Sequence, residues 1–312
     1  MVARSLMKCL DFIIIGAQKA GTTTLFTLLS EHSKIYMPAG KEAPFFTQDE
    51  LYEKGLNAYL NQYFGSAPSN KLWGKATPHY LNDPRAPERI ARLQPDIKII
   101  AILREPAERA LSQFRMSVRR GFEHRTFEQA IAEMMKPEEL AEARKLPTGP
   151  ASETRTYIVR GEYGRLLAPY FDIFPHKNIL ILFTSELESN PSAVLDKLFN
   201  FLGVNSFRPA SIGKKFHEGG ERERFTFYRH LAKFFIVRTT WKAIPPSIRS
   251  RIWFWIHHHN LIKNKDSLEN HSPNLTSQLR DHYRDDTAFL EKLIMQEVPW
   301  HNQTSEITMP PT

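Results

Sequence analysis

Short apolar runs alternate with amphipathic stretches along most of this chain. Phe12–Ile15 is a β-branched run that ends at Gly16, which is typical of a buried parallel strand. Thr22–Glu31 follows with leucines at helical spacing, so a strand, a glycine loop and a helix come in direct succession. Ile97–Leu103 is the clearest buried strand in the chain. The N-terminal part of the chain is therefore predicted to alternate between strands and helices.

The same alternation continues as far as residue 203. Strands are expected at Phe12–Ile15, Lys34–Met37, Lys71–Gly74, Ile97–Leu103 and Ile179–Phe183. Helices are expected at Thr22–Glu31, Asn57–Phe64, Ala86–Leu93, Pro106–Arg119, Thr126–Met135, Glu162–Phe174 and Pro191–Leu202, with closing helices in Ser277–Gln296. Alternation of this kind gives a parallel sheet with helices on both faces. We therefore predict an α/β protein.

Two stretches depart from this alternation. Lys136–Ser152 has three prolines and many charges, and is predicted to be a loop or a flap. Residues 221–262 are rich in Phe, Trp, Ile, Arg and Lys. They are predicted to form two helices that pack on the core, or else a lip over a binding site, an oligomer contact or a membrane-surface patch. The consecutive histidines His257–His259 point to different faces of a helix, which argues against a metal site there.

Composition narrows the class of protein. The chain has 312 residues, of which 41% are hydrophobic, enough for a substantial core. Its net charge is +8, which suggests an anionic ligand, substrate or surface, but no block of basic residues marks a nucleic-acid arm. Cys9 is the single cysteine, and neither a signal peptide nor a run of 18 apolar residues is visible. These features predict a cytoplasmic protein.

The loop Gly16–Thr23 carries the strongest chemical signal. Its two glycines are spaced as in the phosphate loop G-x-x-x-x-G-K-[ST], whose backbone N–H groups and following helix form an anion cradle. The position after the second glycine is Thr22, whereas the lysine comes earlier, at Lys19. Arg104 ends the central strand, where a Mg²⁺-binding hydrolase often places an aspartate. The loop therefore suits a phosphate bound without a metal.

Three further clusters follow predicted strands and would open onto the same edge of the sheet. Arg104 lies at a strand end where ligands bind in open α/β sheets, and Arg109 and Ser112 follow on the next helix. A guanidinium with a hydroxyl group is a good clamp for a second phosphate. The segments Lys41–Phe46 and Gly74–Tyr80 place titratable groups beside aromatic residues or proline.

Together these segments resemble the sulfotransferase family that uses 3′-phosphoadenosine 5′-phosphosulfate (PAPS). The closer resemblance is to its carbohydrate branch, which includes heparan sulfate sulfotransferases and many bacterial relatives. The resemblance rests on Gly16–Thr23, Lys41–Phe46, Lys75–Pro78, Arg104–Pro106, Arg109 and Ser112, and it extends to Gly161–Phe174, Leu180–Pro191, Phe199–Gly203 and Pro273–Trp300. It implies a P-loop-type three-layer fold in one domain over residues 1–312, with a helical insertion or lip at about 221–265.

The resemblance also implies a role for each matched residue. It assigns the 5′-phosphosulfate of the donor to Lys19, Ala20, Gly21, Thr22 and Thr23, and the 3′-phosphate to Arg104 and Ser112. It makes Glu42 the general base, and Lys19 and Lys75 the groups that stabilise charge on the bridging oxygen and the sulfuryl group. Gly219–Arg224 is a looser match to a late loop that closes on the nucleotide.

Several alternatives remain open. In the cytosolic branch of the family the base is a histidine, so His79 competes with Glu42. A nucleotide kinase or hydrolase of the P-loop class, or a non-catalytic nucleotide-binding protein, would share the same loop. The expected partners are an anionic nucleotide donor and a carbohydrate or other small acceptor, with no nucleic acid and no metal. Residues 225–262 could contact a membrane surface, and the oligomeric state is left unassigned.

Overall fold

The computed structural model describes residues 9–40, 42–147, 149–213, 221–223, 261–263 and 271–301. Five parallel strands form one sheet in the order β2-β3-β1-β4-β5. The strands are β1 (Phe12–Gly16), β2 (Ile35–Tyr36), β3 (Leu72–Ala76), β4 (Lys98–Leu103) and β5 (Ile179–Phe183). Every residue of β1 and β5 is buried, as an apolar strand covered on both faces should be. The predicted parallel sheet is confirmed.

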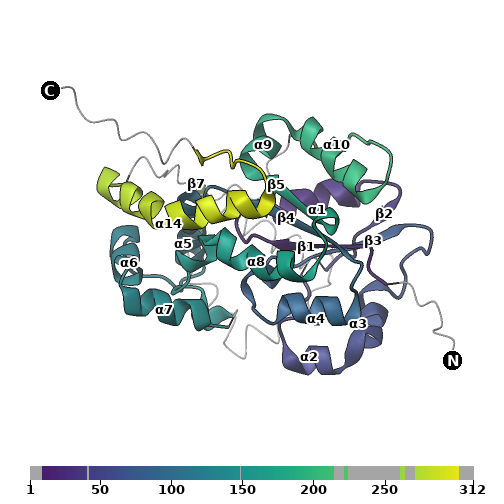
Figure 1. Cartoon of the computed structure of the whole chain (residues 1–312), viewed down its shortest axis with the longest axis horizontal. Coiled ribbons are helices and arrows are strands. Elements are labelled where there is room, and N and C mark those ends of the chain that lie inside the picture. Colours follow the sequence, from purple (N-terminus) through teal and green to yellow (C-terminus); the bar gives the residue numbers. More distant parts are fainter. Residues whose placement is uncertain are drawn as a thin grey trace, which may run out of the picture.

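Helices cover both faces of this sheet, so the expected three-layer α/β fold is confirmed. They are α1 (Thr22–Ser30), α2 (Asp49–Glu53), α3 (Gly55–Phe64), α4 (Ala86–Leu93), α5 (Pro106–Arg119), α6 (Phe127–Met134), α7 (Pro137–Lys145), α8 (Tyr163–Ile173), α9 (Thr184–Ser189), α10 (Pro191–Leu202) and α14 (Pro273–Ile294). In Figure 1, α1, α9 and α10 lie on one side of the sheet, and α3, α4 and α8 lie on the other. Helices α2 and α9 had no counterpart in the sequence analysis.

A second, smaller hydrophobic cluster lies beyond the sheet. It is built by α5, α6 and α14 together with the segment between α7 and α8, and Figure 1 shows these helices gathered at one end of the molecule. Its members include Phe114, Phe127, Tyr157 and Tyr283, all buried. Helix α14 is a single helix and contacts both α8 and α5. Helix α14 therefore links the second cluster, through α5, to the helix α8 that packs on the sheet.

The prediction of a loop or flap over Lys136–Ser152 is wrong for most of its length. Helix α7 occupies Pro137–Lys145, with two glutamates in its first turn and Arg144 and Lys145 in its last. The three prolines in the stretch favoured a loop. Pro137, however, sits in the first turn, where its missing N–H leaves no intrahelical bond unmade, and the helix charges suit its dipole.

The predicted helical insertion at about 221–265 is described only at two places. Strands β6 (Glu221–Glu223) and β7 (Leu261–Lys263) pair antiparallel near its two ends. The residues between them, where helices are predicted, lie outside the described residues. The histidine run, nearly all of the proposed membrane contact at 225–262 and half of the late loop Gly219–Arg224 lie outside the described residues.

Among the described residues, no helix is both long enough and apolar enough to cross a membrane.

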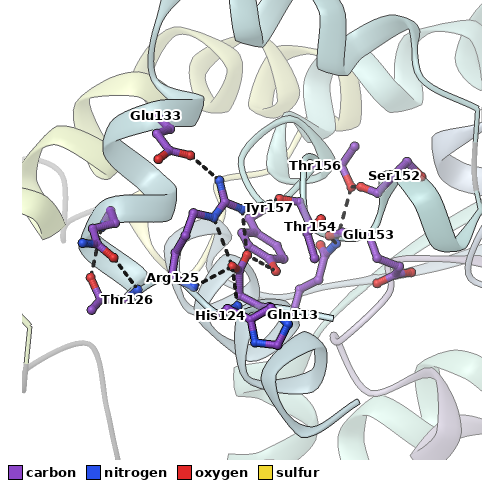
Figure 2. Close-up of polar contacts among 12 residues, drawn as sticks. Gln113, His124, Arg125, Thr126, Glu133, Ser152, Glu153, Thr154, Thr156 and Tyr157 are labelled. Atoms are coloured by element: carbon purple, nitrogen blue, oxygen red, sulfur yellow. Dashed lines mark hydrogen bonds and ion pairs between the residues drawn. The ribbon is translucent and has the colours of Figure 1, made fainter. Parts of the chain in front are cut away.

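A buried carboxylate ties the second cluster together. Glu123 accepts hydrogen bonds from Arg125 Nη2 at 2.7 Å and from the Tyr157 hydroxyl at 3.0 Å. Arg125 also donates to Glu133 of α6 and to the carbonyl oxygen of Thr154 (Figure 2). Burial would raise the pKa of Glu123, but these bonds lower it from 4.5 to about 2. The ion pair therefore holds residues 122–126 against the segment before α8.

Replacing Glu123 by glutamine should lower the free energy of unfolding by about 2–3 kcal/mol at pH 7, because Arg125 and Tyr157 lose a charged partner. A carboxylate with a depressed pKa contributes stability above its unfolded pKa and loses it as pH falls toward the folded value of about 2. The difference between wild type and variant should therefore be smaller at pH 3 than at pH 7. Urea unfolding at both pH values measures it, and an equal difference at both would contradict the assignment.

Candidate functional site

The carboxyl ends of the parallel strands define the candidate site. The connection after β1 leads toward β2 at one edge of the sheet, and the connection after β4 leads toward β5 at the other. In open sheets a crevice forms at the point where neighbouring strands lead in opposite directions. The loop after β1 and the start of α5 flank that point. Topology thus brings Lys19 and Arg104, which are far apart in the sequence, to one place.

The loop between β1 and α1 has the backbone of a phosphate-binding turn. Lys19 has φ 73° and Gly21 has φ 102°, both in the left-handed region that reverses the chain before α1. Helix α1 begins at Thr22 and has no acidic side chain in its first turn. Its N-cap residue is Gly21, so no N-cap side chain accepts a hydrogen bond from the first N–H groups of the helix. The positive end of α1 is therefore suited to an anion that lies on the loop from Lys19 to Thr23.

Gly16 allows the turn after β3 to approach the phosphate loop. A Cβ atom at this position would lie 2.7 Å from the Cβ of Leu81, closer than packed side chains come. The hydroxyl group of Thr184 lies 2.6 Å from the carbonyl oxygen of Ala20 and 3.0 Å from that of Leu103. The loop is thus fixed to β4 and α9 on one side and to the β3 turn on the other.

Positive charge converges on Lys19. Its pKa is lowered from 10.5 to about 8, and burial is the largest cause. Arg119 and Arg120 at the end of α5, and Arg104 after β4, contribute to this lowering, whereas Glu153 acts in the opposite direction. A group of cations that weakens the proton affinity of one member is a preformed site for an anion.

Arg119 and Arg120 were not selected by the sequence analysis. Arg119 lies about two turns beyond Ser112 on the same face of α5, so helical spacing from the predicted phosphate-binding serine was the available signal. Ser112 is buried, and Arg104 binds Glu108 Oε2 through its Nε atom at 2.9 Å. An anion at this end of α5 would compete with Glu108 for Arg104.

Arg109 does not join this group. It is fully buried and donates to Gln113 Oε1 at 2.8 Å and to the carbonyl oxygen of Tyr157. These contacts make it part of the packing between α5 and the segment before α8. In the sequence Arg109 groups with Arg104 and Ser112, because helical spacing alone does not distinguish the buried face of a helix from the face that meets a ligand.

Glu42 and His79 are neighbours. Glu42 Oε2 lies 4.0 Å from His79 Nε2, and the Glu42 side chain is 47% exposed. The next residue, Ala43, is pinned at both backbone groups: its N–H donates to Thr77 Oγ1 at 3.1 Å, and its carbonyl accepts from the Tyr80 hydroxyl. The β3 turn therefore places the two candidate bases side by side, while the rest of the Glu42 side chain reaches toward solvent.

Lys75 lies beneath this segment. It is fully buried in β3, donates to the carbonyl oxygen of Gly40, and holds its ammonium nitrogen 3.9 Å from the centre of the Tyr63 ring. Burial lowers its pKa from 10.5 to about 8. The structure thus assigns Lys75 to the Glu42 segment, whereas Lys19 belongs to the phosphate loop. Lys41 lies outside the described residues.

Strand β6 lies against α5, the helix that carries Ser112. This position agrees with a late loop close to the nucleotide, although the side chains of that segment lie outside the described residues. In the described part of the chain, no group of three or more His, Cys, Asp or Glu residues is arranged to hold a metal ion.

Comparison with known proteins gives one consistent result. A family model described as sulfotransferase domain matches residues 10–292. The human bifunctional heparan sulfate N-deacetylase/N-sulfotransferase 3 is 31% identical over 203 residues, covering 62% of this chain and 22% of the relative. The heparan sulfate glucosamine 3-O-sulfotransferase 3B1 of Mus musculus is 28% identical over 192 residues, covering 62% of this chain and 45% of the relative.

A solved structure supports the fold. The sulfotransferase from Alicyclobacillus acidocaldarius superimposes with a TM-score of 0.65 at 23% identity, over 95% of this chain and all of the other. At that identity the likeness concerns the fold alone. The chain matches less than half the length of the two curated relatives named above.

Proposed function

This chain belongs to the sulfotransferase domain family, and from that premise we propose that it transfers a sulfuryl group from PAPS to a hydroxyl or amine group of a carbohydrate. The observation that carries the proposal is the convergence of Arg104, Arg119 and Arg120 on Lys19 beside the N-terminus of α1. PAPS presents a phosphosulfate at one end of its ribose and a phosphate at the other, so it needs two neighbouring cationic subsites. The carbohydrate acceptor is proposed from the names of the curated relatives.

The proposed reaction is an in-line displacement at sulfur. The acceptor oxygen or nitrogen forms a bond to sulfur, while the bond from sulfur to the bridging phosphate oxygen breaks and 3′,5′-ADP leaves. Glu42 takes the acceptor's proton, and His79 at 4.0 Å from it is the second candidate for that role. Lys19 stabilises the negative charge that develops on the bridging oxygen. Lys75, buried beneath the Glu42 segment, keeps that segment in place and supplies positive charge.

Two other functions compete with this proposal. A kinase or hydrolase of the P-loop class would use ATP with Mg²⁺, but it would need a lysine where this chain has Thr22. A non-catalytic nucleotide-binding protein would bind the donor without turnover. The pairing of Glu42 with His79 at the edge of the phosphate site favours an enzyme, because a binding protein has no need of two adjacent bases.

Calorimetric titration with 3′,5′-ADP, and separately with ATP and Mg²⁺, tests the donor site. Wild-type protein should bind 3′,5′-ADP more tightly, and Arg104→Ala should weaken that binding roughly 10- to 100-fold, because a hydrogen bond between charged groups contributes about 1.5–3 kcal/mol. Arg208→Ala is the matched control, because it also removes an arginine that pairs with a carboxylate, Asp196, at 2.7 Å. Arg208 lies near the C-terminal end of α1, since the nearby Ala210 donates to Glu31 there, whereas the phosphate loop precedes the N-terminal end of α1.

Tighter binding of ATP with Mg²⁺, insensitive to Arg104→Ala, would replace the sulfotransferase proposal with the kinase or hydrolase. Binding of 3′,5′-ADP without transfer to any carbohydrate acceptor would favour the non-catalytic protein. A loss in the Arg208→Ala control as large as that in Arg104→Ala would show that the effect is global.

A further inference from the structure

Gln18, the residue before Lys19 in the phosphate loop, forms hydrogen bonds through both atoms of its amide group with the segment of residues 152–160. Its Nε2 atom donates to Glu153 Oε1 at 3.2 Å, and its Oε1 atom accepts from Arg160 Nη1 at 2.8 Å. Arg160 also pairs with Glu153 at 3.2 Å and donates to the Ser152 hydroxyl. Gln18, Glu153 and Arg160 are 8%, 5% and 4% exposed. The amide of Gln18 is therefore fixed in a dry polar network.

The same network is tied to α5. Gln113 donates from Nε2 to the carbonyl oxygen of Glu153 at 2.9 Å (Figure 2). Its Oε1 atom accepts from Arg109. Gln113 is fully buried and directly follows Ser112 in the chain. A continuous path of buried hydrogen bonds therefore runs from the helix proposed to hold the 3′-phosphate to the loop proposed to hold the 5′-phosphosulfate.

We propose that Gln113, Glu153, Arg160 and Gln18 form a brace that fixes the spacing between the two phosphate subsites and so sets the preference for a 3′-phosphorylated nucleotide. This inference rests on the proposed function, because it takes the donor to carry phosphate at both ends of its ribose. The four are positioning residues: they act on the ligand through Lys19 and Ser112, which stand next to Gln18 and Gln113 in the chain.

Spacing matters because the two phosphates of such a donor are joined by one ribose. Once the first phosphate is bound, binding of the second is intramolecular and gains affinity only where the second subsite lies within reach. In catalysis a misplacement of about 1 Å can lower the rate about a hundredfold. We expect the affinity for a ligand that spans both subsites to be sensitive to spacing for the same geometric reason. A nucleotide with a single phosphate does not sense this spacing. Loss of the brace should therefore weaken the binding of 3′,5′-ADP much more than the binding of 5′-AMP.

The charges of the brace are compatible with a stiff element. Burial raises the pKa of Glu153, but Arg160 and the bond from Gln18 outweigh it, so that the pKa stays below its ordinary value. Glu153 thus remains ionised and paired with Arg160. Buried networks with low exposure hold one arrangement more firmly than surface pairs do, because water does not compete for their bonds.

The test compares two brace variants with a matched control. Gln18→Met keeps the length of the side chain but removes the loop end of the brace, and Gln113→Glu keeps a partner for Arg109 but removes the donor to Glu153. Asp83→Asn is the matched control, because Asp83 is another buried carboxylate paired with an arginine, Arg85, at 2.9 Å, and it lies outside the segment of residues 149–161 that carries the brace. Dissociation constants for 3′,5′-ADP and 5′-AMP are measured by calorimetry, and amide hydrogen exchange is followed for residues 17–21.

Both brace variants should reduce the ratio of the 5′-AMP to the 3′,5′-ADP dissociation constant by at least about tenfold and should speed exchange in residues 17–21. Asp83→Asn should lower the melting temperature yet leave the ratio within about twofold. An unchanged ratio in the brace variants, or an equal fall in the control, overturns the brace. If wild-type protein does not prefer 3′,5′-ADP, the proposed function fails instead. Unchanged exchange of residues 17–21 in Gln18→Met would then overturn the brace without reference to any nucleotide.

Discussion

Replacing Lys19 by methionine is expected to lower kcat/KM for sulfuryl transfer by about 10²–10³, the usual loss when one group that stabilises developing charge is removed. The reason is the position of Lys19 between the N-terminus of α1 and three arginines, where charge on the leaving phosphate oxygen would build up. Steady-state kinetics with PAPS and a carbohydrate acceptor measure the change. A loss below about tenfold would mean that the backbone of the loop and the arginines carry this role without it.

The pH dependence of 3′,5′-ADP binding should identify which lysine binds the nucleotide's phosphate. A lysine with a pKa of about 8 is charged below that value, so wild-type affinity for 3′,5′-ADP should fall as pH rises through 8. The fall should vanish in Lys19→Met. Lys75 also has a pKa of about 8, and its ammonium group contacts Gly40 and Tyr63. Lys75→Met is therefore the matched comparison: a fall that persists in Lys19→Met and disappears in Lys75→Met would reverse the assignment.

Replacing Glu42 by glutamine is expected to lower kcat by about 10²–10⁴, the range for loss of a general base, while affinity for 3′,5′-ADP stays unchanged. Glutamine keeps the shape of the side chain and removes only its ability to take the proton. The backbone of Ala43 remains pinned by Thr77 and Tyr80, so the segment should keep its place. Single-turnover kinetics and calorimetry on the same sample separate the chemical step from donor binding.

His79→Asn decides between the two candidate bases. If Glu42 is the base and His79 only orients it across the 4.0 Å between them, the histidine variant should lose less activity than Glu42→Gln. The double variant should then be no slower than Glu42→Gln alone, because the histidine acts through the carboxylate. A larger loss in His79→Asn than in Glu42→Gln would make the histidine the base.

Strands β1, β4 and β5 were predictable because each contains an apolar run without interruption, whereas β3 extends beyond the predicted Lys71–Gly74 to include Lys75 and Ala76. In β1 and β5 every residue is buried, so composition alone marks them. The phosphate loop was equally clear, since its glycines adjoin a strand and a helix. Helix α7 was missed because Pro137 was taken as a sign of a loop when it marks a helix start. Local residue patterns thus succeeded wherever burial or a turn geometry dictates the residue type.

The rest of the site depends on contacts that no local pattern carries. Lys19 and Lys75 both follow from motifs, yet the sequence could not show that Lys75 packs under Gly40 while Lys19 faces arginines from α5. The buried position of Arg109 depends on Tyr157, which belongs to a different segment. Likewise, no local pattern around Gln18 predicts its hydrogen bond with Arg160, because the two residues are 142 positions apart in the sequence.

That separation has a consequence for how the protein is made. During synthesis at about 5–20 residues per second, Arg160 is added roughly 7–30 s after Gln18. Just before Arg160 is added, the nascent chain contains β1 to β4 but lacks the arginine that hydrogen-bonds to Gln18 of the phosphate loop. A nucleotide stabilises only the state that binds it well, so it cannot protect a chain cut short before residue 160. Binding of the proposed donor would thus distinguish chains that contain Arg160 from chains that end before it.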